Sequence, residues 1–138
     1  MDKALNYLSI ARKAGLVELG EEPVGDITRS GKGYLVAVAA DASDHTWRRA
    51  KSFVAGTAQQ CIRLPYSKEE MGMAVGRTSL AIAAVTDPAL ALSLVESMGE
   101  PEKYKAVTEV LADKVRRLRQ RQSEAKAHQR NLRKGKKK

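Results

Sequence analysis

The apolar positions of the chain are organised around Tyr34 to Ala40, seven apolar residues in a row that precede a small and acidic turn, Asp41 to Asp44. An uninterrupted run of this kind predicts a strand buried on both faces, because helices cover both sides of its sheet. Two more apolar runs, Cys61 to Leu64 and Leu80 to Val85, predict two further strands. Leu16 to Leu19 is expected to form either a short strand or an extended entry to the next helix.

Helix signals occupy the segments between and outside these strands. Capping side chains, prolines in a first turn and glycines after a last turn give the approximate bounds. Ser67-Lys68-Glu69-Glu70 has the spacing of a capping box, in which a serine precedes a glutamate by three residues. The expected helices run from Asp2 to Gly15, from Gly20 to about Ser30, from Ser43 or Asp44 to Gly56, from Ser67 through Gly72 and Gly76, from Asp87 to Gly99, and from Pro101 to Leu118.

Strands that alternate with helices over crossovers longer than ten residues predict an α/β fold. We expect residues 1–100 to form a three-layer α/β/α sandwich with a small mixed, mostly parallel four-stranded sheet. Residues 101–118 predict an amphipathic helix. Residues 119–138 contain no apolar side chains except alanines and Leu132, so this basic tail is expected to be disordered in isolation. The apolar stripe of the amphipathic helix consists of Tyr104, Val107, Leu111, Val115 and Leu118.

The charge of the chain is concentrated in its last quarter. The net charge is +9 over 138 residues, yet residues 1–100 carry 11 Lys/Arg against 12 Asp/Glu, and residues 101–138 carry 14 against 4. A cationic arm on a neutral domain favours a polyanionic partner, because neutralised phosphates release their counterions. The alternative is a tail that only increases solubility. Nucleic acid is the preferred interpretation, since the arm holds so few acidic residues.

Other features of the sequence narrow the class of protein. The N-terminal segment is too polar for a signal peptide and no apolar run reaches membrane-spanning length, so we expect a cytoplasmic protein without membrane contact. Cys61 is the only cysteine and permits neither an internal disulfide nor a multi-cysteine metal site.

The search for catalytic chemistry gives a negative expectation. Gly25 to Gly33 resembles a phosphate-binding loop, but its spacing is one residue too long and it ends a helix instead of opening one. His45 and His128 have no metal-ligand spacing around them, and Ser67 is explained as a helix cap. We therefore expect no enzyme, no cofactor and no metal. The remaining polar and aromatic candidates have structural explanations: Asp41 and Asp44 as turn residues, Cys61 as an inert thiol, and Tyr34 and Trp47 as core residues.

Several local patterns together resemble one family. They are Leu8-Ser9-Ile10-Ala11-Arg12-Lys13-Ala14-Gly15, Gly20-Glu21-Glu22 with Arg29-Ser30-Gly31-Lys32, Leu35 to Ala42, and Ser67-Lys68 followed by Gly72, Ala74 and Gly76. In this order and spacing they resemble the kink-turn RNA-binding ribosomal-protein superfamily (the L-seven-Ae and L-thirty-e group), and most closely its small bacterial YlxQ-type members. The resemblance covers about residues 3–98 and implies a domain that binds structured RNA without catalysis or cofactor.

The resemblance also implies where RNA would bind. The family contacts RNA through the start of the second helix, the turn after the central strand and the loop before the last strand, which correspond here to Gly20 to Asp26, Asp41 to Trp47, and Lys68 with Gly76 to Ser79. A helix N-terminus offers unpaired N–H groups to phosphates or base edges. The candidate RNA-binding residues are Gly20, Glu21, Glu22, Arg29, Lys32, Lys68, Arg77 and Thr78 in the domain, with Arg116, Arg117, Arg119, Arg121, Arg130, Arg133 and Lys134 in the arm.

This sequence departs from the family at its reading positions. The second-helix signature of the family is Gly-x-Asn-Glu-x-x-Lys, whereas this chain has Gly20 followed by Glu22, Pro23 and Asp26 at the three positions that read the RNA. Acidic groups near phosphates are unfavourable, so either the RNA differs from a standard kink-turn or the arm supplies most of the affinity.

Two alternative functions are considered, the first of which is consistent with these departures. In one, the domain has lost its RNA site and serves as a protein-interaction module that self-associates or binds a partner through residues 104–118. In the other, the domain assists an RNA-modifying enzyme carried on another chain, as similar domains do in ribose methyltransferases. The leading hypothesis is a non-enzymatic RNA-binding protein whose partner is ribosomal or other structured RNA, with the ribosome as a candidate assembly.

Overall fold

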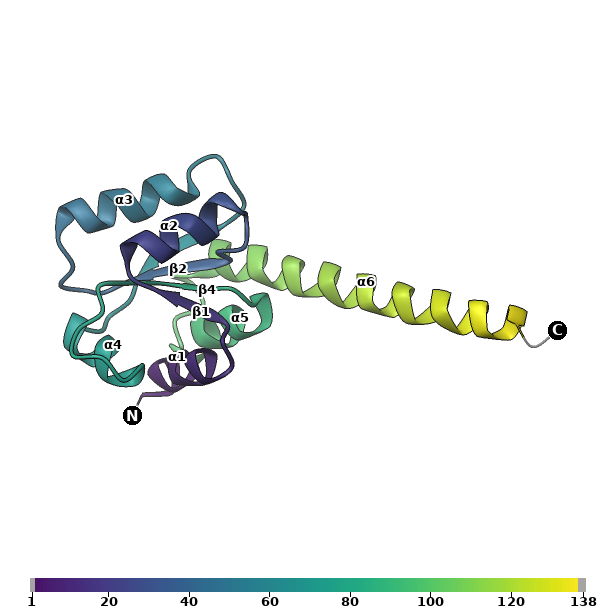
Figure 1. The fold of residues 1–138 in the computed structure, drawn as a ribbon. Coiled ribbons are helices and arrows are strands. Elements are labelled where there is room, and N and C mark those ends of the chain that lie inside the picture. Colours follow the sequence, from purple (N-terminus) through teal and green to yellow (C-terminus); the bar gives the residue numbers. More distant parts are fainter. Residues whose placement is uncertain (1, 137–138) are drawn as a thin grey trace.

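A computed structural model describes residues 2–136 of the chain, with side chains through Asn131. Ten elements follow one another (Figure 1). They are α1 (Lys3–Lys13), β1 (Val17–Leu19), α2 (Glu21–Arg29), β2 (Leu35–Val38), α3 (Asp44–Val54), β3 (Gln60–Arg63), α4 (Lys68–Ala74), β4 (Ile82–Val85), α5 (Pro88–Ser97) and α6 (Lys105–Lys136).

The domain has three layers, as expected. Helices α2 and α3 cover one face of the sheet, and α1, α4 and α5 cover the other (Figure 1). All residues of β2 and β4 are buried because they lie between these helical layers. Both strands are therefore buried on both faces, as their uninterrupted apolar runs predict.

The sheet is mixed, but the expectation that it is mostly parallel is wrong. The strand order is β1-β4-β2-β3, and only β2 and β3 pair in parallel, while β4 pairs antiparallel with both β1 and β2. Crossovers longer than ten residues permit parallel neighbours but do not require them. Here the last strand of the chain is inserted between the first and the second.

Local signals placed most helix ends correctly. The side chains of Asp2, Ser43 and Asp87 accept hydrogen bonds from backbone N–H groups of the first turns of α1, α3 and α5, so Ser43 and not Asp44 caps α3. At α4, Ser67 and Glu70 form the predicted capping box. Together these caps accept hydrogen bonds from backbone N–H groups that otherwise have no partner at the start of a helix.

The last helix differs from the prediction at both ends. Residues 101–104 form turns, so α6 begins at Lys105 and not at Pro101, and it continues to Lys136 without a break at Leu118. The part expected to be disordered is helical through residue 136, whereas residues 137–138 lie outside the described residues. Ala, Arg, Gln and Lys dominate this segment and favour helix, and a composition argument for disorder does not weigh that propensity.

Helix α6 consists of a packed root, residues 105–115, and a projecting arm that begins at residue 116. Its root packs against α5, and Leu111 and Val115 are buried. Residues 116–131 are all exposed, and the helix extends away from the domain (Figure 1). Among the described residues, no helix is long and apolar enough to cross a membrane.

Candidate RNA interface

The register of the sheet brings the three predicted segments to one edge. Val38 at the end of β2 is paired with Arg63 at the end of β3 and with Ile82 at the start of β4, which lies next to Leu19 at the end of β1. The segments after β1 and β2 and before β4 therefore meet at this edge. They are the three segments that the resemblance predicts to contact RNA, and we call the surface they form the loop edge.

Backbone hydrogen bonds hold the segments of the loop edge together. The N–H of Gly20 donates to the carbonyl of Ile82 (3.0 Å), and the N–H of Ala40 donates to the carbonyl of Tyr66 (2.7 Å). The N–H of Lys68 donates to Asp41 Oδ1 at 2.8 Å, so a carboxylate of the second segment pairs with the first turn of α4 in the third. The loop edge is therefore a connected surface and not a set of independent loops.

The start of α2 presents acidic side chains at this edge. Gly20 precedes the helix with φ +97°, a conformation that favours glycine, and Glu21 and Glu22 lie in the first turn. Glu21 forms an ion pair with Arg49 of α3 at 2.6 Å, and Asp26 forms one with Arg29. The carboxylates of Glu21 and Glu22 suit the positive end of the helix dipole, but they occupy the position that a phosphate would otherwise take.

The loop between α4 and β4 packs tightly on α4. A side chain on Gly72 would place its Cβ 2.7 Å from the backbone nitrogen of Ser79 and 2.9 Å from the carbonyl oxygen of Arg77. The N–H of Arg77 donates to the carbonyl of Gly72 (2.8 Å). Arg77 and Thr78 are exposed at the tip of this loop, where the sequence placed them as RNA contacts.

Other predicted residues lie away from the loop edge. Lys32 lies between α2 and β2, in a turn where the N–H of Gly33 donates to Gln59 Oε1 (2.8 Å), at the opposite edge of the sheet. In the arm, Arg116 and Arg117 lie 3.4 and 2.9 Å from the carboxylate of Asp113. The remaining arm residues fall into two groups: Arg119, Arg121 and Arg130 are exposed, and the side chains of Arg133 and Lys134 lie outside the described residues.

Trp47 packs against the core, as the sequence predicts, but it lies at the margin of the core. It is half-buried, and two cations lie over its ring: the guanidinium of Arg63 at 4.9 Å and the ammonium of Lys51 at 5.4 Å from the ring centroid. Lys51 lies one helical turn after Trp47 on α3, a spacing visible in the sequence. Arg63 comes from β3, and no sequence signal placed it beside Trp47.

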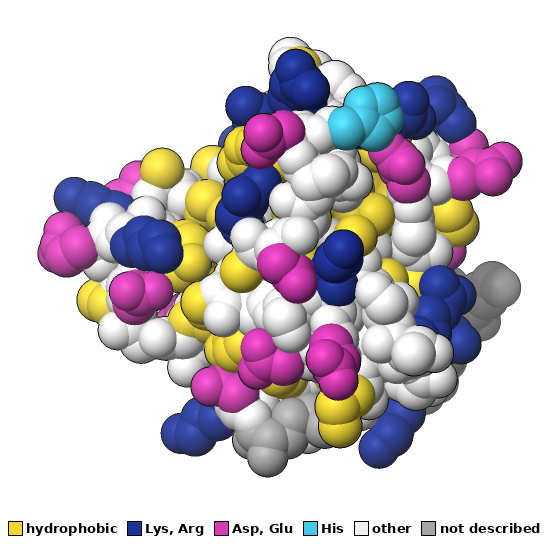
Figure 2. Space-filling model, turned by 90° about the vertical axis from the view of Figure 1, so that its left-hand side faces the viewer, with side chains coloured by type: hydrophobic (Ala, Val, Ile, Leu, Met, Phe, Trp, Pro, Cys, Tyr) yellow, Lys and Arg dark blue, Asp and Glu magenta, His cyan; other side chains and the backbone are white. Residues whose placement is uncertain are grey.

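The charge of the loop edge is mixed. Figure 2 views the molecule from the side on which α4 and the start of α3 lie, and there basic and acidic side chains alternate with hydrophobic ones without a continuous patch of either sign. A surface of this kind does not attract phosphate through its charge alone. Any recognition of RNA by the loop edge therefore depends on shape and on individual contacts.

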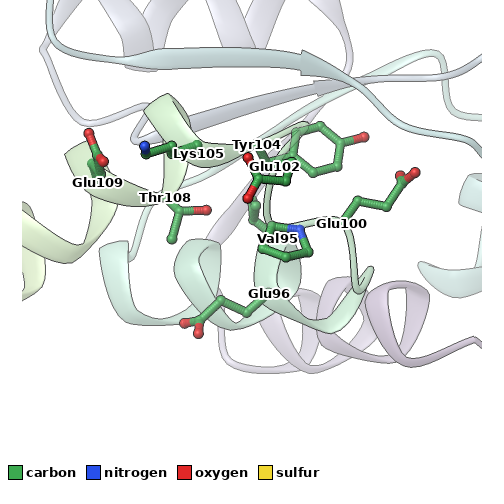
Figure 3. Close-up of a pocket in the computed structure, with 9 residues that line it drawn as sticks. Val95, Glu96, Glu100, Glu102, Tyr104, Lys105, Thr108 and Glu109 are labelled. Carbon is green, nitrogen blue, oxygen red and sulfur yellow. The ribbon is translucent and has the colours of Figure 1, made fainter.

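The cavity between α5 and the root of α6 has the wrong sign for RNA. It has a volume of about 430 Å³, and Figure 3 shows Glu96, Glu100, Glu102 and Glu109 around it. Among the side chains that the structure describes, Lys105 is the only cation that lines it. The acidic groups do not make a metal site, since no group of three or more His, Cys, Asp or Glu within residues 2–136 is arranged to hold an ion.

The environment of Cys61 disfavours the thiolate, which is the nucleophilic form of a cysteine. Cys61 lies in β3, and burial raises its pKa to about 11, although the positive charge of Lys51 opposes the shift. A thiol with this pKa is protonated at neutral pH and is a poor nucleophile.

Comparisons with known proteins identify the fold. No protein-family model and no curated protein matches the chain. A solved structure of a protein with unknown function from Bacillus halodurans is similar with a TM-score of 0.67 and 23% identity, over 72% of this chain and all of that one. The 15.5 kD RNA-binding protein of Giardia lamblia is similar with a TM-score of 0.60 and 20% identity, over 76% of this chain and 87% of that one. The domain therefore shares its fold with an RNA-binding protein.

Proposed function

We propose that this chain is a non-enzymatic, ribosomal-protein-like RNA-binding protein of the kink-turn superfamily that recognises structured RNA, ribosomal or other. The observation that carries the proposal is the convergence of three segments at the loop edge, tied together by the Asp41–Lys68 hydrogen bond. These are the segments through which the family contacts RNA. The fold shared with the Giardia RNA-binding protein supports the same conclusion.

The arm provides most of the electrostatic attraction in this proposal. Residues 101–138 carry 14 Lys/Arg against 4 Asp/Glu, and residues 116–131 are exposed along one helix. Phosphate contacts from the arm add affinity that does not depend on base sequence. The loop edge then supplies the preference for a folded RNA, although its acidic first turn makes a standard kink-turn a poor ligand.

The alternative is a protein-interaction module that binds through the apolar stripe at residues 104–118. One observation weighs against it: Tyr104, Leu111 and Val115 of this stripe are already buried within the chain. Only Leu118 is an exposed large apolar residue of the stripe, with 37% of its surface accessible. A partner would have little apolar surface to bury at this position.

Crosslinking of the protein to RNA in cells, followed by sequencing of the bound fragments, tests the proposed function. We expect crosslinks that concentrate at defined positions of folded RNA, in the cytoplasm and on ribosomal or other non-coding transcripts. Crosslinks spread evenly over transcripts in proportion to their abundance would contradict recognition by the domain. A complete lack of crosslinks, with a protein partner recovered instead, would favour the interaction module.

A further inference from the structure

A groove lies beside β3, between α3 and the root of α6, and its volume is about 450 Å³. Trp47 of α3 forms one wall and Lys103, Tyr104 and Val107 form the other. Ala40 and residues 62–65, at the end of β3, complete the lining. We call it the β3 groove. It lies at the loop edge, because Arg63 is paired there with the last residue of β2.

The guanidinium of Arg63 in this groove has unused hydrogen-bonding capacity. Its Nε and Nη2 are buried and find no hydrogen-bond acceptor among the described residues. Arg63 Cζ lies over the Trp47 ring, 4.9 Å from its centroid, in a contact that supplies no oxygen acceptor for the N–H groups. These two nitrogens are covered by the chain itself, so an outside ligand does not reach them. The positive charge of Arg63 still acts on the groove, because no described carboxylate forms an ion pair with it.

The charges around the groove favour an anionic acceptor. No Asp or Glu of the described part of the chain lines the β3 groove. Lys51 adds a second cation over the same tryptophan, and Lys103 lies on the facing wall. Lys103 is only weakly neutralised, since its ammonium lies 3.8 Å from Glu100 in an exposed pair. The cavity on the α5 side of the same helix root is acidic instead. An anion that reaches the root of α6 is therefore directed to the β3 groove.

The β3 groove lies between the loop edge and the arm, which extend from opposite ends of the sheet. At the start of α6, Val107 and the preceding Tyr104 line the groove at the loop edge. Further along the helix, Lys114 lines a second hollow together with Gln59 at the opposite edge of the sheet. The arm then projects beyond that opposite edge (Figure 1). An RNA strand that follows α6 from the loop edge to the arm passes along the β3 side of the domain.

We propose that the β3 groove binds the phosphate backbone of a single RNA strand that leaves the loop edge and runs along α6 to the arm. The positive charge of Arg63 attracts the phosphates, and Lys51 and Lys103 flank the strand. The contact is with phosphate and not with bases, because two cations lie over the Trp47 ring and only 5% of Tyr104 is exposed. This inference rests on the proposed function and adds a path for the RNA to it.

The test compares two RNAs that share one folded core, with and without a single-stranded extension of about ten nucleotides, a length typical of single-strand sites. The readout is the extension ratio, which is the affinity for the extended RNA divided by the affinity for the folded core alone. It is measured for the full chain and its variants. We expect the extension to increase the affinity of the unmodified protein about tenfold. The ratio should fall to about one in Arg63→Gln, be lowered in Lys103→Gln, and be largely kept in Arg63→Lys.

Arg12→Gln is the matched control, since it removes the same charge from an exposed position of α1, in the helical layer that does not contain α3. An extension ratio that stays at ten in both Arg63→Gln and Lys103→Gln would overturn the groove proposal and leave the proposed function intact. No measurable binding of either RNA by the unmodified protein would instead refute the proposed function.

An acidic peptide is the competing occupant, because β3 is an edge strand. Binding of a poly-glutamate peptide that is lost in Arg63→Gln, combined with no loss of the extension ratio in that variant, would assign the groove to a protein. Loss of the ratio in Arg63→Gln while the peptide fails to bind supports RNA. Lys103→Gln keeps the test decisive if Arg63→Gln unfolds, because Lys103 is exposed.

Discussion

Glu21 and Arg49 form an ion pair across the two helices of one layer, with the Glu21 carboxylate 2.6 Å from Arg49 Nε at the start of α2. The pair neutralises a cation that could otherwise meet phosphate and places a carboxylate at the helix N-terminus. Glu22 and Asp26 add further negative charge to the same helix. The electrostatics of α2 therefore oppose a phosphate at the position where the family binds RNA.

Introducing the kink-turn signature into α2 should create binding to a standard kink-turn. We expect Glu22→Asn, Pro23→Glu and Asp26→Lys together to increase kink-turn affinity about tenfold or more, because a hydrogen bond with a charged partner contributes about 1.5–3 kcal/mol. Isothermal titration with one kink-turn RNA measures the change. Glu102→Lys, at the α5–α6 cavity, alters the net charge by the same amount and is the control. An equal gain in this control would show that charge alone is responsible.

Removing residues 119–138 should weaken RNA binding and flatten its dependence on salt. Each phosphate contact that is lost lowers the slope of log affinity against log salt by about 0.7–0.9, and we expect about six to eight contacts from the arm. Val115 is the last residue known to be buried, so the truncated chain should keep its unfolding temperature. Binding across a salt series measures the slope. An unchanged slope in a folded, truncated protein is incompatible with a role for the arm.

Gly72→Ala should displace the loop that carries Arg77. The added Cβ would lie 2.7 Å from a backbone atom, so the loop must shift, and we expect a loss of unfolding free energy of about 1–3 kcal/mol, as in overpacked sites. Urea denaturation measures the loss. Met73→Ala changes the next residue, which is 71% exposed, and should alter stability by no more than about 0.5 kcal/mol. Equal stability of Gly72→Ala and the unmodified protein would mean that the loop is not packed as described.

Acid should weaken the attachment of α1 through Asp2. The hydroxyl of Tyr66 donates to Asp2 Oδ1 at 2.5 Å, and this bond, with that from the Ala4 N–H, lowers the pKa of Asp2 below its usual 3.8. A lowered pKa gives stability that is complete above pH 3.8 and is lost as the pH falls through the folded-state value. The difference in unfolding free energy between the protein and Tyr66→Phe should therefore be about 1 kcal/mol or less at pH 7 and shrink at lower pH. A difference that does not change with pH would contradict a hydrogen bond from Tyr66 to the ionised carboxylate of Asp2.

The sequence was most informative where a structure depends on neighbours in the chain. The buried strands β2 and β4 follow from unbroken apolar runs, and the capping box at Ser67 and Glu70 follows from a three-residue spacing. These features need no knowledge of the rest of the fold. Their positions were accordingly predicted to within a few residues.

Features that depend on distant residues were missed. The insertion of β4 between β1 and β2 joins segments more than forty residues apart, and no local pattern records it. The Arg63–Trp47 stack likewise depends on where β3 packs beside α3. For the loop edge, the resemblance supplied the segments and the sheet register brought them together, while the role of each residue in RNA binding remains a prediction.

The central claim is that the domain recognises the shape of an RNA and the arm adds attraction to any polyanion. Competition by heparin against a folded RNA, measured for the full chain and for residues 1–118, tests this claim most directly. We expect the folded RNA to be preferred by both proteins, with the truncated one weaker toward both ligands. Equal competition by heparin in both proteins would contradict recognition by the domain and leave only a cationic helix as the binding element.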